Sequence, residues 1–305
     1  MSKYSICTFS LVGTHAFAAK WLIKSTFVFG FRRAVSPDVK RSSLLAFLTL
    51  FVLGAACFLP PIHQSPLYHH FANHSRHLGI ANFWNVGSNL AFLVVAALAW
   101  PRRDCLSEPW QRRCFRILVL GVALTSLGSA YYHWQPSEPS LFWDRLPMTI
   151  VFMCILIMTI GERIDGQLGN TLLWPLLVIG VSSAIYWRLS GDLRPYAVVQ
   201  FYPMIVIPLM LIFWKLPTEQ KATSLLAQWL MIAFYGVAKI AEFADSRGAT
   251  MPFGAHAWKH IFAAVGLLIY TQAVTQHADL HPASPTCRPS ASFSKRTSPE
   301  PPLAS

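Results

Sequence analysis

The feature that most constrains the fold is the alternation of long apolar blocks with short polar breaks. The blocks contain roughly 16 to 21 residues, the length that a helix needs to cross the hydrocarbon core of a bilayer. The composition argues against a soluble globule, because 54% of the 305 residues are hydrophobic and only 12% are charged. We therefore predict an all-α fold, a polytopic transmembrane helical bundle. Its expected spans are 43–60, 82–100, 114–133, 143–160, 171–187, 197–214, 224–243 and 257–275.

The segments around these blocks suggest a simple organisation. Residues 1–42 form an N-terminal extension and 43–60 an additional span, whereas 82–275 form one membrane domain. Between them lies a histidine-rich connector, 61–81, whose five histidines match no ligand spacing, so an exposed connector is expected rather than a metal site. The tail, 276–305, is rich in Pro and Ser and is expected to be disordered.

The distribution of basic residues predicts the topology. A net charge of +12 does not indicate nucleic acid here, because Lys and Arg lie in connectors and termini rather than on one amphipathic face. Counted over alternate connectors, they place both termini in the cytoplasm, with an even number of spans. Without organelle signals, we expect a bacterial inner membrane. The outer side holds little more than Arg76, Arg188, Arg194 and Arg247.

Five polar residues fall at span ends that this topology assigns to the outer face. Ser129 and His133 end the third span, Asp144 opens the fourth, and His256 and His260 open the eighth. Ionisable groups at membrane depth are costly and tend to mark function. Because all five share one depth, we predict that they form one site.

The residue types in this group indicate metal chemistry. Positions i and i+4 share a helix face, so His256 and His260 can bind one ion. With His133, three histidine nitrogens around Zn²⁺ leave a fourth position open, as in catalytic zinc sites. Asp144 would take a proton from water and pass it to a leaving amine, and Ser129 would donate a hydrogen bond to the water or to a developing oxyanion.

Each of these residues also has an ordinary structural interpretation. An interfacial histidine often serves as a polar anchor, and a serine near a helix end often bonds to its own backbone. Asp144 is also compatible with an N-cap or with an ion pair to Arg145.

Other polar residues near the predicted site have supporting or structural roles. Asp245, at the outer end of the seventh span, is a candidate to orient a ligand histidine. Asn85 and Ser88, in the first turns of the second span, can bond to neighbours inside the bundle, and a structural role is favoured for them. Lys239 and Glu242, at i and i+3, suggest a structural ion pair.

Four sequence blocks resemble the signature blocks of the alkaline ceramidases, a family within a superfamily of seven-helix membrane hydrolases that includes adiponectin-receptor-like proteins. The blocks are Phe83-Trp-Asn-Val-Gly-Ser-Asn89, Gly128-Ser-Ala-Tyr-Tyr-His133, Trp143-Asp-Arg-Leu-Pro-Met148 and His256-Ala-Trp-Lys-His260. The resemblance spans roughly residues 80 to 275.

The resemblance carries expectations for fold and chemistry. It implies a seven-helix hydrolase core at 82–275 plus one extra N-terminal span. It also implies zinc ligands at His133, His256 and His260, and active-site residues at Ser129 and Asp144. Family members use a zinc-activated water to cleave the amide of ceramide, which yields a sphingoid base and a fatty acid.

The chain departs from the calcium-using eukaryotic members in its first block. Those members have an acidic cluster before the first core helix and a glutamate where this chain has Asn82, so calcium is not expected. Lys259 stands where a tryptophan is often found, which suggests a different substrate wall. The Trp143-to-Met148 block looks more like the bacterial branch of the family.

We therefore predict a zinc-dependent hydrolase of a lipid amide such as ceramide, with substrate entering sideways from the bilayer. One alternative is a receptor or sensor with a structural zinc. Another is a transporter whose buried ionisable residues relay protons. The headgroup, the acyl chain and the oligomeric state are left open.

Overall fold

The computed structural model describes residues 37–214, 223–249 and 251–276, with side chains from residue 43 onward. The chain divides into two compact units, 1–49 and 50–305, and helix α2 (Pro37–Phe58) crosses the division. This helix begins six residues before the span expected at 43–60. All other described elements belong to the second unit.

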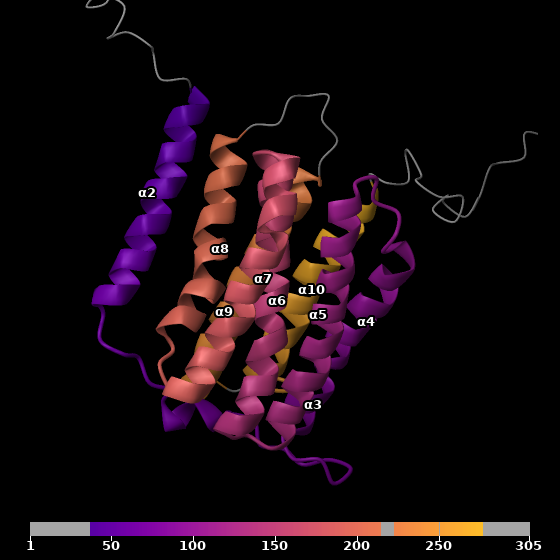
Figure 1. Cartoon of the computed structure of the whole chain (residues 1–305). Helices are drawn as coiled ribbons and strands as arrows, with labels where there is room; N and C mark the ends of the chain where they lie inside the picture. Colours follow the sequence, from indigo (N-terminus) through magenta and orange to yellow (C-terminus); the bar gives the residue numbers. More distant parts are fainter. Residues whose placement is uncertain (1–36, 215–222, 250, 277–305) are drawn as a thin grey trace, which may run out of the picture. The chain divides into compact units, whose positions relative to one another are not determined.

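The second unit is a helical bundle, and its described residues contain no β-strand (Figure 1). The predicted all-α class is therefore confirmed. Its elements are η1 (Pro66–His69), α3 (Phe83–Gly87), α4 (Leu90–Ala99), η2 (Trp100–Arg102), α5 (Pro109–Trp134), α6 (Glu138–Arg163), α7 (Gly166–Ser190), α8 (Arg194–Phe213), α9 (Leu225–Ser246) and α10 (Ala255–Gln276).

Six helical segments in the described part of the chain are long and apolar enough to cross a membrane. They comprise the α3–α4 segment (Phe83–Arg102) and helices α5 to α9. Helix α10 has 22 residues, so its length suffices, but its first two turns carry His256, Lys259 and His260 and lower its apolar character. The chain is thus an integral membrane protein, and two of the residues predicted to form the site, His256 and His260, lie in the first turns of α10.

The helices extend beyond the apolar blocks because polar residues form their first turns. Helix α6 begins at Glu138, five residues before the predicted start, after a capping box in which Ser137 and Ser140 each satisfy the other's backbone N–H. Asp144 therefore lies in the second turn of α6 and does not cap it, so the N-cap interpretation is wrong.

The second predicted span, 82–100, is interrupted rather than continuous. It divides into α3 and α4, with Ser88 and Asn89 between them. The side chains of both residues donate hydrogen bonds to the Asn85 carbonyl, at 3.1 and 2.7 Å. Such bonds compete with the helical backbone pattern and account for the break.

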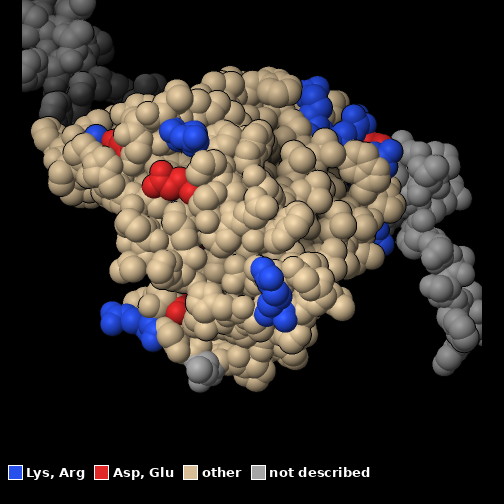
Figure 2. All heavy atoms as spheres, turned by 90° about the horizontal axis from the view of Figure 1, so that it is seen from below, with Lys and Arg blue, Asp and Glu red and all other residues tan. Residues whose placement is uncertain are grey.

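Helix α6 is the most enclosed of the six apolar segments and packs against α5, α7 and α8 (Figure 1). Helix α10 packs against α9 and α4, whereas α8 and α9 touch only sparsely. Seen from the end where α5 finishes and α6 begins, the surface consists mainly of uncharged residues with scattered acidic and basic groups (Figure 2). The predicted site residues all lie toward this end of their helices.

The contact between α5 and α6 is unusually close at Gly128. Pro147 has no N–H, so the Trp143 carbonyl has no donor four residues ahead in α6. A Cβ atom at Gly128 would lie 2.7 Å from the carbonyl carbon of Trp143 and even nearer to its oxygen. Glycine is therefore required at this crossing, which sets Ser129 beside Asp144.

Candidate metal centre and adjoining cavity

The structure brings together three histidines that the sequence separates by more than a hundred residues. His133 ends α5, and His256 and His260 lie one turn apart at the start of α10. All three are buried, and one ring nitrogen of each lies within 4.8 Å of those of the others. This group is compatible with a bound metal ion.

The second ring nitrogens of two of these histidines are already engaged. Nδ1 of His256 lies 3.4 Å from the Asp245 carboxylate, and Nδ1 of His260 lies 2.8 Å from the Ser88 hydroxyl. Ligand histidines usually use their second nitrogen in this way, which fixes the ring and the tautomer. Nε2 of His260 is then left for a metal, and Nε2 of His256 has only a long 3.5 Å contact, with Nζ of Lys259.

His133 is the least satisfied of the three histidines. It is 1% exposed, and neither of its ring nitrogens has a hydrogen-bond partner among the described residues. Its backbone carbonyl accepts a hydrogen bond from Nδ2 of Asn82 at 2.9 Å, which anchors the end of α5. An unpartnered buried imidazole is costly, and a metal would supply the missing partner.

Asn85, predicted as a supporting residue, makes no side-chain hydrogen bond within the described structure. Its backbone carbonyl instead accepts a hydrogen bond from the Ser88 hydroxyl. A residue that sequence reasoning missed is Phe71, whose ring lies edge-on to His133 and His256, with centroids 4.8 and 4.9 Å away. Phe71 belongs to the histidine-rich connector and shields the histidines from water.

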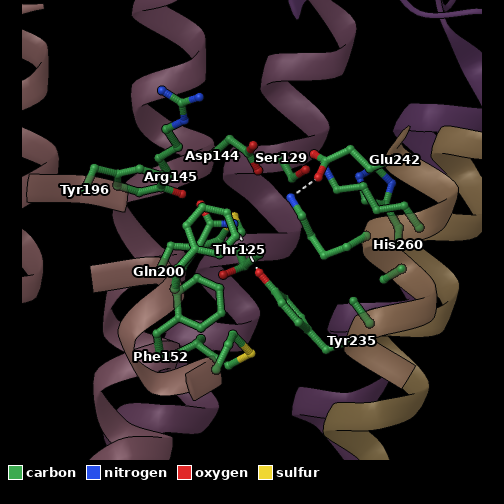
Figure 3. Close-up of a pocket in the computed structure, with 18 of the residues that line it drawn as sticks. Thr125, Ser129, Asp144, Arg145, Phe152, Tyr196, Gln200, Tyr235, Glu242 and His260 are labelled. Carbon is green, nitrogen blue, oxygen red and sulfur yellow. Dashed lines mark hydrogen bonds and ion pairs between the residues drawn. The ribbon is translucent and has the colours of Figure 1, made fainter. Parts of the chain in front are cut away.

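Ser129 and Asp144 form a pair next to the histidines. Both are buried, and they lie side by side at the same end of the cavity (Figure 3). Asp144 forms no salt bridge with Arg145 in the described structure, which removes the ion-pair interpretation. The helical contact at Gly128 holds this pair together, so its geometry depends on the α5–α6 crossing.

A charged network lies on the opposite wall of the site. Glu242 pairs with Lys239, as expected from the sequence, and also with Lys259, whose Nζ is 2.7 Å from Oε1 of Glu242. The same Nζ lies 3.5 Å from Nε2 of His256. The role of Lys259 was not foreseen, although its position three residues after His256 on one helix was a usable signal.

A cavity of about 490 Å³ leads from these groups into the bundle. Ser129, Asp144 and His260 lie at its polar end, and its deeper wall is largely apolar (Figure 3). Helices α8 and α9 both line it, and Gln200 donates a 3.1 Å hydrogen bond to Tyr235 between them. Its size lies within the usual range for small-molecule sites.

The histidines of the connector do not belong to this centre. The one three-residue group in the described chain that can hold a metal is that of His133, His256 and His260. His69 is half-buried, with Nδ1 3.1 Å from the Tyr132 hydroxyl, and the other four connector histidines are exposed. The expectation of an exposed connector agrees with this arrangement.

Fold and site together define a helical integral membrane protein with a buried three-histidine centre that opens into an apolar cavity. The family model described as Ceramidase matches residues 72–291, which is most of the chain. The chain therefore belongs to the ceramidase family, and the resemblance carried by the four blocks is confirmed at that level. A search of curated proteins finds no match.

Proposed function

We propose that the protein is a zinc-dependent intramembrane hydrolase that cleaves the amide bond of a lipid such as ceramide. Family membership supports hydrolysis of amide bonds. The observation that carries the proposal is the convergence of three buried histidines with the Ser129–Asp144 pair at the polar end of an apolar cavity.

His133, His256 and His260 would hold the zinc, because one ring nitrogen of each lies within 4.8 Å of those of the others. Neither ring nitrogen of His133 has another partner among the described residues. When bound there, zinc would act as a Lewis acid toward the amide carbonyl and would lower the pKa of a water molecule. Asp245 and Ser88 would keep His256 and His260 in the required tautomer.

The protein's own groups would then manage the proton and the developing charge. The Asp144 carboxylate would accept a proton from the attacking water and deliver it to the leaving amine nitrogen. The Ser129 hydroxyl, which lies beside Asp144, would donate a hydrogen bond to the substrate oxygen as charge develops there. Burial of both groups keeps bulk water away from this exchange.

The acyl chain of the substrate would occupy the apolar part of the cavity. Helices α8 and α9 both line it but pack only sparsely against each other, so lipid would enter sideways between them. The hydrogen bond from Gln200 to Tyr235 would have to break during entry. The contact between Nζ of Lys239 and the Phe201 ring, whose centroid is 5.6 Å away, would also be lost.

The proposed placement in the membrane follows the distribution of basic residues. Both termini would be cytoplasmic and the site would face outward, in a bacterial inner membrane. Residues 82–275 would form the catalytic bundle, and 43–60 would add one span. The topology can be checked by thiol labelling of single cysteines introduced at Arg76 and Arg103, with the first expected to be accessible from outside.

The test combines lipid hydrolysis with metal analysis on purified protein. Wild type should release fatty acid from lipid amides, Asp144→Asn should keep its zinc and lose hydrolysis, and His256→Ala should lose both. His74→Ala, an exposed connector histidine, serves as the matched control. Zinc without hydrolysis of any lipid amide or ester would favour a receptor, and absence of metal together with solute-driven proton flux would favour a transporter.

A further inference from the structure

Arg145 is a buried cation without a counter-ion. It follows Asp144 on α6, lines the same cavity and is 6% exposed. Nη2 donates a 2.6 Å hydrogen bond to the Gln64 side chain, whereas the buried Nη1 has no hydrogen-bond partner. No described acidic residue forms a salt bridge with it.

Three aromatic rings surround the Arg145 guanidinium instead. Its Cζ lies 5.3, 4.3 and 4.9 Å from the ring centroids of Tyr68, Trp187 and Tyr196. Such rings orient and partly stabilise a cation, but they do not neutralise it. The buried Nη1 thus keeps donor capacity that no described residue uses, and a bound anion would supply its missing partner.

Most other charged groups of the cavity pair with one another. Glu242 pairs with both Lys239 and Lys259, whereas Asp144 forms no salt bridge among the described residues. Three basic residues thus face two acidic ones in the cavity wall, and the basic residue without an ionic partner is Arg145. A bound metal cation would increase this positive excess.

We propose that Arg145 recognises an anionic group on the substrate, so that the preferred substrate is an acidic lipid amide with a carboxylate or phosphate on the amine side of the scissile bond. This inference rests on the hydrolase function proposed above. Arg145 and Asp144 line the same cavity, so a substrate that places its amide at Asp144 can extend an anionic group on its amine side toward Arg145. The planar guanidinium suits carboxylate and phosphate oxygens.

The experiment compares matched substrates that differ in charge. One pair is N-palmitoylglycine and its neutral amide, N-palmitoylglycinamide; the other is ceramide 1-phosphate and ceramide. Wild type should prefer the anionic member of at least one pair by roughly 10- to 100-fold in kcat/KM, the range expected for a hydrogen bond to a charged group. The preferred pair tells whether the anion is a carboxylate or a phosphate.

Arg145→Gln should abolish the preference mainly by slowing hydrolysis of the anionic substrate, and Arg145→Lys should retain part of it. Arg163→Gln is the matched control, because Arg163 is buried on the same helix but lies outside the cavity. If Arg145→Gln lowered kcat/KM equally for both members of a pair, Arg145 would only connect the 61–81 connector to the bundle through Gln64. That result would overturn the proposal.

Ligand-induced thermal stabilisation separates this inference from the hydrolase function. Asp144→Asn, which should bind the ligands without cleaving them, should be stabilised more by N-palmitoylglycine or ceramide 1-phosphate than by the neutral counterpart. Charge-selective stabilisation without hydrolysis of any lipid would refute the hydrolase alone. Hydrolysis without charge preference in wild type would refute the role of Arg145 alone.

Discussion

Replacing Gly128 by alanine tests whether the α5–α6 crossing controls the site. The added Cβ would meet the Trp143 backbone, which cannot move aside as a flexible side chain would. Gly128 and Trp143 directly precede Ser129 and Asp144, so any separation of the helices moves the two polar groups apart.

The size of the effect follows from the distances. The new Cβ would lie 2.7 Å from the Trp143 carbonyl carbon, where ordinary contacts begin at 3.4 Å, so the helices must separate by at least 0.7 Å. Overpacking of this kind costs about 1–3 kcal/mol of stability. Because a misplacement of about 1 Å can cost roughly 100-fold in rate, we expect hydrolysis to fall on the order of 10- to 100-fold.

The assay measures thermal unfolding in detergent, zinc content and lipid-amide hydrolysis on the same preparations. Gly236→Ala is the control, since Gly236 lies inside α9 and a Cβ there meets nothing within 4 Å. That variant should be as stable as wild type or slightly more so. If Gly128→Ala matched wild type in both stability and rate, the proposed dependence of the Ser129–Asp144 pair on this crossing would be wrong.

Three further predictions concern groups around the site and at the bundle end. Asp245→Ala should weaken zinc binding by roughly 10- to 100-fold, measured by competition with a chelator, because His256 loses the partner of its Nδ1; unchanged affinity would contradict that role. Lys259→Met should lower the midpoint of thermal unfolding, because Glu242 keeps only Lys239 as an ionic partner among the described residues, and Glu242→Gln in the same chain should recover part of the loss; no recovery would argue against coupling. The hydrogen bond from Arg194 lowers the pKa of Asp192 to about 2, so its stabilisation is present above the unfolded pKa of about 3.9 and is lost as the pH falls toward 2. The difference in unfolding temperature between wild type and Asp192→Asn should therefore shrink between pH 4 and pH 2, and a constant difference would refute this assignment.

Much of the architecture follows from hydropathy, because helices that cross a bilayer must be long and apolar. The helix ends do not follow from it: α5 and α6 begin at Pro109 and Glu138, before their apolar blocks, and the start of α6 depends on local capping by Ser137. The break between α3 and α4 depends on side-chain bonds from Ser88 and Asn89, which compete with the backbone and leave no hydropathy signal.

The candidate site, too, could be predicted from the sequence only in part. Spacing and topology were enough to group His133, His256 and His260 at one depth, and the structure places their ring nitrogens together. The contacts of Arg145 and Lys259 depend on helix rotation and side-chain direction across three or four helices. A sequence pattern does not encode these, so the Arg145–Asp144 pair considered as an alternative is absent among the described salt bridges, and a Lys259–Glu242 pair is present.

The central claim is that three histidines from α5 and α10 hold one metal ion. It is tested most directly by elemental analysis of purified wild type, His133→Ala and His74→Ala. We predict about one zinc per chain in wild type and in His74→Ala, and a loss of zinc in His133→Ala, because a site with two remaining protein ligands binds weakly. Wild type without zinc, or His133→Ala with its full complement, would contradict the claim.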